Sequence, residues 1–217
     1  KEFIGLDRFE ARKQLLKKLK ENNFFVEEEN IKNKVPYGDR SNSIIEPYLT
    51  EQWFADAKKL SIKAKEIVNN KSTNFFPENW SKTYFQWMDN IEPWCVSRQL
   101  WWGHQIPAWY GPDGKVFVEY TEEEAIKEAK NYYKKDVELK RDEDVLDTWF
   151  SSGLWPFATL GWPNQTDYLK KFYPTTVLVT GFDIIFFWVA RMMMMGMAFL
   201  EKEPFKDIYV HALVRDE

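Results

Sequence analysis

The spacing of apolar and polar residues divides the first part of the chain into helical and extended segments. Residues 5–22 place leucine and phenylalanine near one face of a helix and lysine and arginine on the other. Residues 50–69 repeat that pattern, and a third helix is expected within residues 77–94. Residues 23–46 predict a strand, a turn and a second strand.

The stretch after Pro107 predicts a small excursion from the main fold. Gly111-Pro112-Asp113-Gly114 is typical of a hairpin turn between two apolar strands, and a helix rich in Glu and Lys follows it. We expect that helix to present a solvated face rather than a binding site.

The last third of the chain changes to an α/β pattern. The segment that starts at Asp144 begins as a strand edge. Residues 177–180 predict a strand, residues 184–200 a helix and residues 208–214 another strand. A strand, a helix and a strand at this spacing predict a parallel crossover unit.

A single carboxylate, Asp183, stands at the turn between the apolar strand and the apolar helix. In an open α/β sheet this position lies at the carboxyl end of a strand, where ligands bind. The carboxylate would suit an ammonium group, and the apolar residues after it would suit a small hydrocarbon side chain, so an amino acid fits as ligand. The competing interpretation is that Asp183 only caps the helix.

The apolar stretch 177–200 also has the length of a membrane span. Asp183 and Arg191 lie inside it, and each would cost about 2.5–3.5 kcal/mol at the centre of a bilayer. We therefore reject a membrane span.

Composition narrows the class of protein. The chain has 217 residues, 44% of them hydrophobic, which is enough for one large domain or two small ones. A net charge of −4 argues against nucleic-acid binding by bulk charge alone. A single cysteine, Cys95, excludes a disulfide framework and a multi-cysteine zinc site, and we expect it to be a buried core thiol.

Eleven tryptophans, clustered between Trp53 and Trp188, predict an aromatic-rich concave surface, although most of them, Trp101 and Trp102 included, are expected to be packing residues. The start of the chain shows no signal peptide, and a reducing cytoplasm fits. The chain also lacks an initiator Met, so we expect it to be a piece of something longer.

Several stretches together resemble class I valyl-tRNA synthetases, in the order of that family and over nearly the whole chain. They are Asp147-Thr148-Trp149-Phe150-Ser151-Ser152, Ser97-Arg98-Gln99-Leu100-Trp101-Trp102-Gly103-His104, Gly181-Phe182-Asp183-Ile184 through Trp188, Gly5-Leu6-Asp7-Arg8-Phe9-Glu10-Ala11-Arg12, and Gly38-Asp39-Arg40-Ser41. The related isoleucyl-tRNA synthetases differ after the Gly-x-Asp turn and in the Trp-Phe motif, which favours valine.

The resemblance implies an α/β fold class: the second half of a class I synthetase Rossmann-like catalytic domain, with an α+β connecting region and the tail of the editing insertion. Residues 1–45 would end the editing domain, and residues 46–107 would be a helical region that returns to the catalytic core. Residues 108–141 would be a small hairpin-plus-helix insertion, and residues 142–217 the second half of the catalytic domain.

The family activates valine with ATP to valyl-adenylate and transfers it to tRNA(Val). The resemblance therefore implies valine, ATP with Mg²⁺ and tRNA(Val) as substrates, with no membrane partner, a cytoplasmic location and a monomeric full enzyme. The His-x-Gly-His and Lys-Met-Ser-Lys-Ser motifs and the His-Asp-Pro-type editing motif do not occur here. The isolated chain is expected to be inactive, without catalytic residues or zinc of its own.

Site roles follow from the resemblance position by position. Asp183 would bind the substrate ammonium, while Ile184, Trp188 and Trp149 would line the pocket for the isopropyl group. For the two tryptophans, the competing interpretation is ordinary core packing.

The remaining roles concern nucleotide and tRNA. Gly181, together with Asp183, would admit the adenylate ribose, because glycine lets the backbone approach a ligand closely. His211 would lie by the adenosine, although a satisfied core histidine is the alternative, and Ala212 stands where the family usually has Gly. Arg98 would contact tRNA or, as we prefer, brace its loop.

Two other functions stay open from the sequence. The first is a stand-alone truncated paralogue that binds tRNA or a protein; the missing ATP motifs favour it and the amino-acid pocket disfavours it. The second is an isoleucine-specific relative of the same family.

Overall fold

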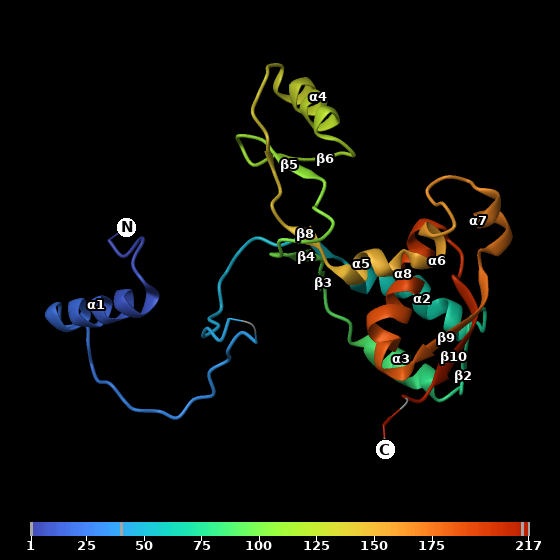
Figure 1. The fold of residues 1–217 in the computed structure, drawn as a ribbon, viewed down its shortest axis with the longest axis horizontal. Helices are drawn as coiled ribbons and strands as arrows, with labels where there is room; N and C mark the ends of the chain where they lie inside the picture. Colours follow the sequence, from blue (N-terminus) through green and yellow to red (C-terminus); the bar gives the residue numbers. More distant parts are fainter. Residues whose placement is uncertain (1, 40, 214, 217) are drawn as a thin grey trace. The chain divides into compact units, whose positions relative to one another are not determined.

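The computed structural model describes residues 2–39, 41–213, 215 and 216, and it divides into two compact units, Lys1–Thr50 and Glu51–Glu217 (Figure 1). The first unit contains one helix, α1 (Arg8–Glu21), where a helix was predicted. Asp7 caps it, because its carboxylate accepts the backbone N–H of Phe9 at 2.9 Å.

The strand–turn–strand prediction for residues 23–46 was wrong. The described residues of this stretch form a single isolated bridge, between Tyr37 and Ile44, and no ladder. The apolar side chains that would have formed a buried face are exposed, among them Val26 and Ile31. A pair of strands without a face to bury is marginal in water, so the chain stays irregular.

The second unit is built on a parallel sheet of β2 (Asn74–Phe76), β10 (Phe205–His211) and β9 (Thr175–Gly181), in that order. The two strands predicted in the last third of the chain are thus present and parallel, and Val214, where the second was expected to end, lies outside the described residues. Strand β2 was not predicted, because three residues are too few to show a period.

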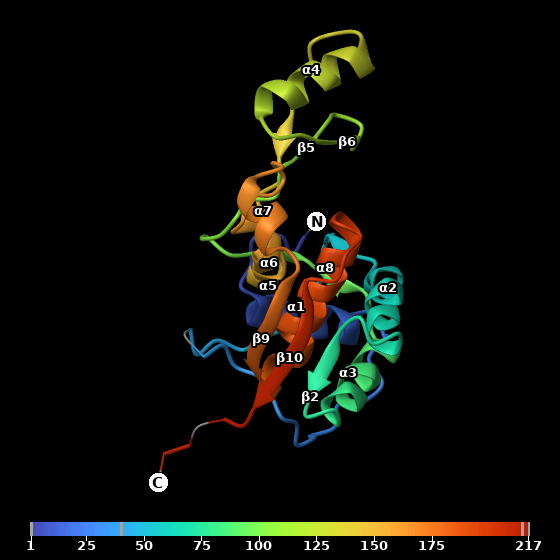
Figure 2. The same cartoon turned by 90° about the vertical axis from the view of Figure 1, so that its right-hand side faces the viewer.

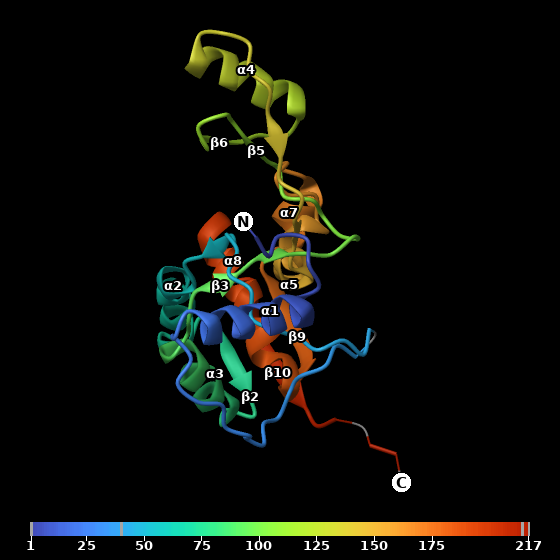
Figure 3. The same ribbon diagram turned by 90° about the vertical axis from the view of Figure 1, so that its left-hand side faces the viewer.

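Three helices cover one face of this sheet: α2 (Ala57–Asn69), α3 (Trp80–Asp89) and α8 (Arg191–Phe199). Figures 2 and 3 show α2 and α3 along the β2 edge of the sheet. The row Phe75, Ile208 and Leu178 is paired across the three strands and buried against these helices. The methionine run at the start of α8 fills the same core.

The opposite face of the sheet is open in the described residues. The neighbouring row, Phe76, Tyr209 and Val179, is about half exposed, at 48%, 54% and 61%. Alternate residues of a strand point to opposite faces, so this row stands on the side away from α2, α3 and α8.

The helix predicted over residues 184–200 is present with a different start. A 3₁₀ turn, η1 (Phe182–Ile184), is followed by a π-helix, η2 (Ile185–Ala190), and only then by α8. Periodicity of 3.6 cannot reveal a π segment, which is short, rare and frequent at functional sites. The run Phe182–Phe199 is apolar and long enough to cross a membrane, but half of it is buried inside the fold, as in a core helix.

The expected hairpin and helix are present after Pro107, as β5 (Ala108–Tyr110), β6 (Val116–Val118) and α4 (Glu122–Tyr133), with β7 (Lys140–Arg141) completing a small sheet. They have a core of their own around Trp109 and Phe117. Figure 3 shows this insertion projecting from the rest of the second unit.

Short antiparallel pairs connect the insertion with the main sheet: β1 (Phe54–Ala55) pairs with β3 (Trp94–Cys95), and β4 (Ser97–Arg98) pairs with β8 (Val145–Leu146). The helices α5 (Thr148–Gly153), α6 (Trp155–Ala158) and α7 (Asp167–Phe172) then lead into β9. Strand β8 is the strand edge that was expected after Asp144.

Candidate functional site

The carboxyl ends of β9 and β10 bring together three of the predicted site residues. Gly181 ends β9 and is paired with His211 of β10, while Asp183 follows two residues later in η1. Asp183 and His211 are both exposed. The structure thus places an exposed carboxylate and an imidazole at the sheet edge where ligands bind in open α/β folds.

The carboxylate of Asp183 lies against the backbone of Gly181. A Cβ placed on Gly181 would stand 2.5 Å from Asp183 Oδ1, so the carboxylate would have to move away. Neither η1 nor η2 has a side-chain cap, so the interpretation of Asp183 as a helix cap is wrong. Glycine therefore lets the carboxylate keep this position.

His211 is exposed, so the interpretation as a core histidine is also wrong. Its Nδ1 lies 2.7 Å from the carbonyl oxygen of Ala212. His211 lies two residues after Tyr209 on β10, and alternate residues of a strand point to the same face. The imidazole therefore stands on the side of the open row.

The predicted pocket residues Trp149 and Trp188 come from two elements that pack on each other, α5 and η2. Trp149 lies in the first turn of α5 and stacks on Phe187, with ring centroids 5.9 Å apart. Trp188 donates its indole N–H to the carbonyl oxygen of Ser152 at 3.2 Å. Both tryptophans are half-buried: each packs against the core and keeps an accessible surface. Ile184, beside Asp183, is also half-buried.

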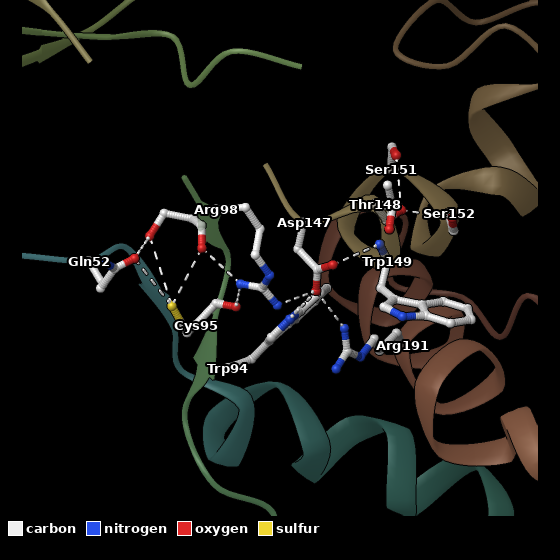
Figure 4. A network of polar contacts seen from close by, with 11 residues as sticks. Gln52, Trp94, Cys95, Arg98, Asp147, Thr148, Trp149, Ser151, Ser152 and Arg191 are labelled. Atoms are coloured by element: carbon white, nitrogen blue, oxygen red, sulfur yellow. Dashed lines mark hydrogen bonds and ion pairs between the residues drawn. The ribbon is translucent and has the colours of Figure 1, made fainter. Parts of the chain in front are cut away.

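One buried carboxylate was quoted in a motif but given no role. Asp147 follows β8, is 5% exposed, and caps α5 by accepting the backbone N–H of Trp149 on Oδ1 at 3.3 Å. Its other oxygen, Oδ2, accepts from the indole of Trp94 at 2.9 Å and from Arg191 at 3.1 Å, and it forms an ion pair with Arg98 at 3.1 Å (Figure 4). The signal in the sequence was the same as for Asp183, a carboxylate between a strand and a helix.

Arg191 is a charged residue within the apolar stretch 177–200. It is 8% exposed, and its guanidinium lies over the ring of Trp94, 3.9 Å from the centroid. Burial lowers the pKa of Arg191, and the carboxylate of Asp147 opposes that change by stabilising the charged form. Removing one partner of such a buried pair costs about 3–5 kcal/mol.

The guanidinium of Arg98 makes its contacts within its own loop and with Asp147. Its Nη1 donates to the carbonyl oxygens of Cys95 and Ser97, each at 2.8 Å, and its Nη2 meets Asp147. These bonds use the two ends of the guanidinium within the connecting strands, while the side chain stays 38% exposed.

Three residues near Arg98 depart from expectation. Cys95 is half-buried beside polar groups, with its Sγ 3.7 Å from Gln52 Oε1, so the prediction of a buried core thiol was wrong. Trp94 takes the buried position of that strand instead. Trp101 and Trp102 are fully exposed rather than packed, because the loop turns at Gly103, outside the core.

No group of three or more His, Cys, Asp and Glu side chains in the described part of the chain is arranged to hold a metal ion. The remaining buried carboxylate, Asp142, accepts the indole N–H of Trp53 at 2.8 Å and the hydroxyl of Tyr110 at 2.7 Å. Burial raises its pKa, but these hydrogen bonds outweigh burial and hold the pKa below its usual range. This carboxylate joins the insertion to the segment before β1.

Comparison with known proteins decides the family. The family model described as tRNA synthetases class I (I, L, M and V) matches residues 10–217. The chain belongs to this family. The resemblance found in the sequence is thereby confirmed.

Class I synthetases specific for valine are similar to the whole chain. It is 80% identical over 217 residues to a valine–tRNA ligase of Pelagibacter ubique, covering 100% of this chain and 25% of that protein. A valine–tRNA ligase of Nitrobacter winogradskyi is 58% identical over 235 residues, with the same shares covered. The chain thus spans about a quarter of the length of these relatives.

Solved class I synthetases share the fold. A Mycobacterium tuberculosis methionyl-tRNA synthetase bound by methionyl-adenylate aligns with a TM-score of 0.53 at 14% identity, over 84% of this chain and 30% of that one. A second structure of a Mycobacterium tuberculosis methionyl-tRNA synthetase, in complex with methionyl-adenylate, aligns with a TM-score of 0.54 at 13% identity. It covers 82% of this chain and 29% of that one. The fold class expected for this synthetase chain is confirmed.

Proposed function

We propose that the chain forms the amino-acid-binding part of a valine–tRNA ligase, which activates valine with ATP and transfers it to tRNA(Val). The observation that carries this proposal is the exposed carboxylate of Asp183, seated over Gly181 at the carboxyl end of β9 and followed directly by η2. The 80% identity with a valine–tRNA ligase supports valine over isoleucine.

Asp183 binds the ammonium group of valine in this proposal. An exposed carboxylate offers a charge-assisted hydrogen bond worth about 1.5–3 kcal/mol. Ile184, Trp149 and Trp188 enclose the isopropyl group, since their half-buried apolar surfaces lie on the elements that flank the carboxylate. Such a pocket combines apolar walls with one polar group that fixes orientation.

Gly181 and His211 belong to the nucleotide side of the site. Gly181 has no side chain to block the approach of the adenylate ribose, and His211 stands beside it on the next strand. The carboxylate oxygen of valine attacks the α-phosphorus of ATP, the bond to the β-phosphate breaks, and pyrophosphate leaves. Residues of this chain orient the amino acid for that attack, which is an entropic contribution.

The proposal extends to organisation and partners. Residues 1–45 end the editing domain, residues 46–107 connect back to the core, residues 108–141 form an insertion, and residues 142–217 complete the catalytic fold. ATP acts with Mg²⁺ as substrate, and the full enzyme works as a monomer in the cytoplasm. Arg98 serves as a brace of the cleft rather than as a tRNA contact, since its donors are engaged within the connecting strands.

The test uses the full-length ligase that contains this chain. Asp183→Asn is expected to lower kcat/KM for valine in ATP–pyrophosphate exchange about tenfold to hundredfold, because the side chain that binds the ammonium group loses its negative charge. Asp167→Asn is the matched control, since that carboxylate is fully exposed at the start of α7. Near-normal exchange in Asp183→Asn would overturn the ammonium role.

A further inference from the structure

Three segments that are distant in the sequence meet at one carboxylate. Asp147 Oδ1 holds the first turn of α5, whereas Oδ2 holds Arg191 at the start of α8 and Arg98 with Trp94 in the connecting strands (Figure 4). At 5% exposure, Asp147 is shielded from water, which strengthens each of these bonds.

The first of these contacts fixes Trp149. The helix α5 has six residues, too short to hold itself without tertiary contacts. Asp147 accepts the backbone N–H of Trp149 itself, and the Asp147 N–H donates to the carbonyl oxygen of Val96 at 2.7 Å. The position of the Trp149 backbone therefore depends on Asp147.

The second contact fixes the segment that carries Trp188. Arg191 follows η2 directly, so its ion pair with Asp147 anchors the end of the π-helix. Helix α5 also meets the start of α8 at Gly153, where a Cβ would lie 3.6 Å from the Cβ of Arg191. Trp188 in turn donates to the Ser152 carbonyl of α5. One carboxylate thus sets how α5 sits on η2.

We propose that Asp147 is a positioning residue that sets the separation of Trp149 and Trp188 and, through it, the selectivity for the amino-acid side chain. This inference rests on the proposed function, in which these two tryptophans form the walls of the valine pocket. Asp147 itself lies behind the walls: its two oxygens are engaged with Trp149, Trp94, Arg98 and Arg191.

The role requires the charge and not only the shape of Asp147. An asparagine at this position keeps one oxygen to accept the capping hydrogen bond. Its NH₂ group is a donor, however, and it would face the donors of Trp94, Arg98 and Arg191, which need an acceptor. Arg191, buried over the ring of Trp94, would then lose its counter-ion and move. The walls of the pocket would follow, because Arg191 and Trp149 share that carboxylate.

The experiment compares Asp147→Asn with Asp56→Asn in the full-length ligase. Asp56 is also a helix-capping carboxylate, which accepts from Lys59 N–H at 3.0 Å, but it caps α2 and has no arginine partner among its hydrogen bonds and ion pairs in the described residues. Asp147→Asn is expected to raise KM for valine at least tenfold, to leave KM for ATP within twofold, and to lower the preference for valine over isoleucine at least fivefold. Asp56→Asn is expected to leave all three within twofold.

A second measurement follows the tryptophans directly. With fluorotryptophan incorporated, ¹⁹F NMR resonances of Trp149 and Trp188, assigned through their Phe variants, are expected to shift or broaden in Asp147→Asn and to stay in place in Asp56→Asn. If Asp147→Asn does not fold, Arg191→Lys replaces it, since it keeps the charge but loses the planar guanidinium, and the same changes are expected.

The two measurements separate the inference from the function on which it rests. Unmoved resonances, or equal increases in KM for valine and for ATP, would overturn the positioning role. Resonances that move without any change in KM for valine would instead show that Trp149 and Trp188 do not line the amino-acid pocket, and the proposed site assignment would fail.

Discussion

The carboxylate of Asp183 occupies the space that a side chain on Gly181 would need, since a Cβ there would come within 2.5 Å of Oδ1. Gly181→Ala is therefore expected to displace Asp183 while leaving β9 paired with β10. In the full-length ligase, kcat/KM for valine in ATP–pyrophosphate exchange should fall about a hundredfold, as for an ångström-scale misplacement of a binding group. An Ala variant with normal exchange would show that Asp183 needs no fixed position.

The core of the second unit depends on the methionines of α8. Met193 is fully buried, and Met193→Ala is expected to destabilise this unit by about 2–5 kcal/mol, since the cavity refills only partly. Native-state hydrogen exchange of the α8 amides measures the loss. The half-buried Met197 gives the matched control, and equal effects at both positions would contradict the burial argument.

Alkaline pH is expected to destabilise the second unit through buried phenols. Burial raises the pKa of Tyr84, and burial together with the hydrogen bond to Asp142 raises the pKa of Tyr110 to about 12. Both groups stay protonated in the fold after their unfolded counterparts ionise near pH 10, so stability is complete below pH 10 and is lost as the pH rises above it.

The Tyr84→Phe variant separates the contribution of Tyr84 to this pH dependence from that of Tyr110. The hydroxyl of Tyr84 donates to the carbonyl oxygen of Ala64 at 2.9 Å, so its loss is expected to cost about 0.5–1.5 kcal/mol at neutral pH. The decline of the melting temperature between pH 9 and 11 should be shallower in the variant. A slope equal to that of the unmodified protein would argue against Tyr84 as a source of the alkaline loss.

A fall in pH is expected to destabilise the packing of the insertion, residues 108–141, against the rest of the second unit. The folded pKa of Asp142 lies below its ordinary 3.8, so the stability from this carboxylate is present above that value and is lost as the pH falls through the folded pKa. Asp142→Asn should increase hydrogen exchange in β5 and in the segment around Trp53 at pH 7 already. Unchanged exchange in both segments would show that the insertion is held by other contacts.

Periodicity and turn chemistry predicted much of this fold. The two apolar strands expected over residues 177–180 and 208–214, and the hairpin with its helix, all follow local rules, and the structure has them as β9, β10 and the hairpin with α4, although the strand bounds differ. Asp183, Gly181 and His211 could be placed together because carboxyl ends of adjacent parallel strands meet at one edge.

The rest depended on contacts that no local pattern encodes. Residues 23–46 have extended composition but no buried face, and the π-helix η2 differs from an α-helix only in hydrogen bonds. The ion pairs of Asp147 were not predictable for another reason: its partners Arg98 and Arg191 lie 49 and 44 residues away in the sequence, and only the tertiary fold assembles them.

The open row of Phe76, Val179 and Tyr209 has a consequence for handling the polypeptide. Parallel sheets in stable proteins are covered on both faces, whereas this one presents half-exposed apolar side chains in adjacent strands. In dilute solution this 217-residue chain by itself should therefore bind hydrophobic dyes and scatter light as its concentration rises. Its shelf life as a reagent would be set by self-association rather than by loss of secondary structure.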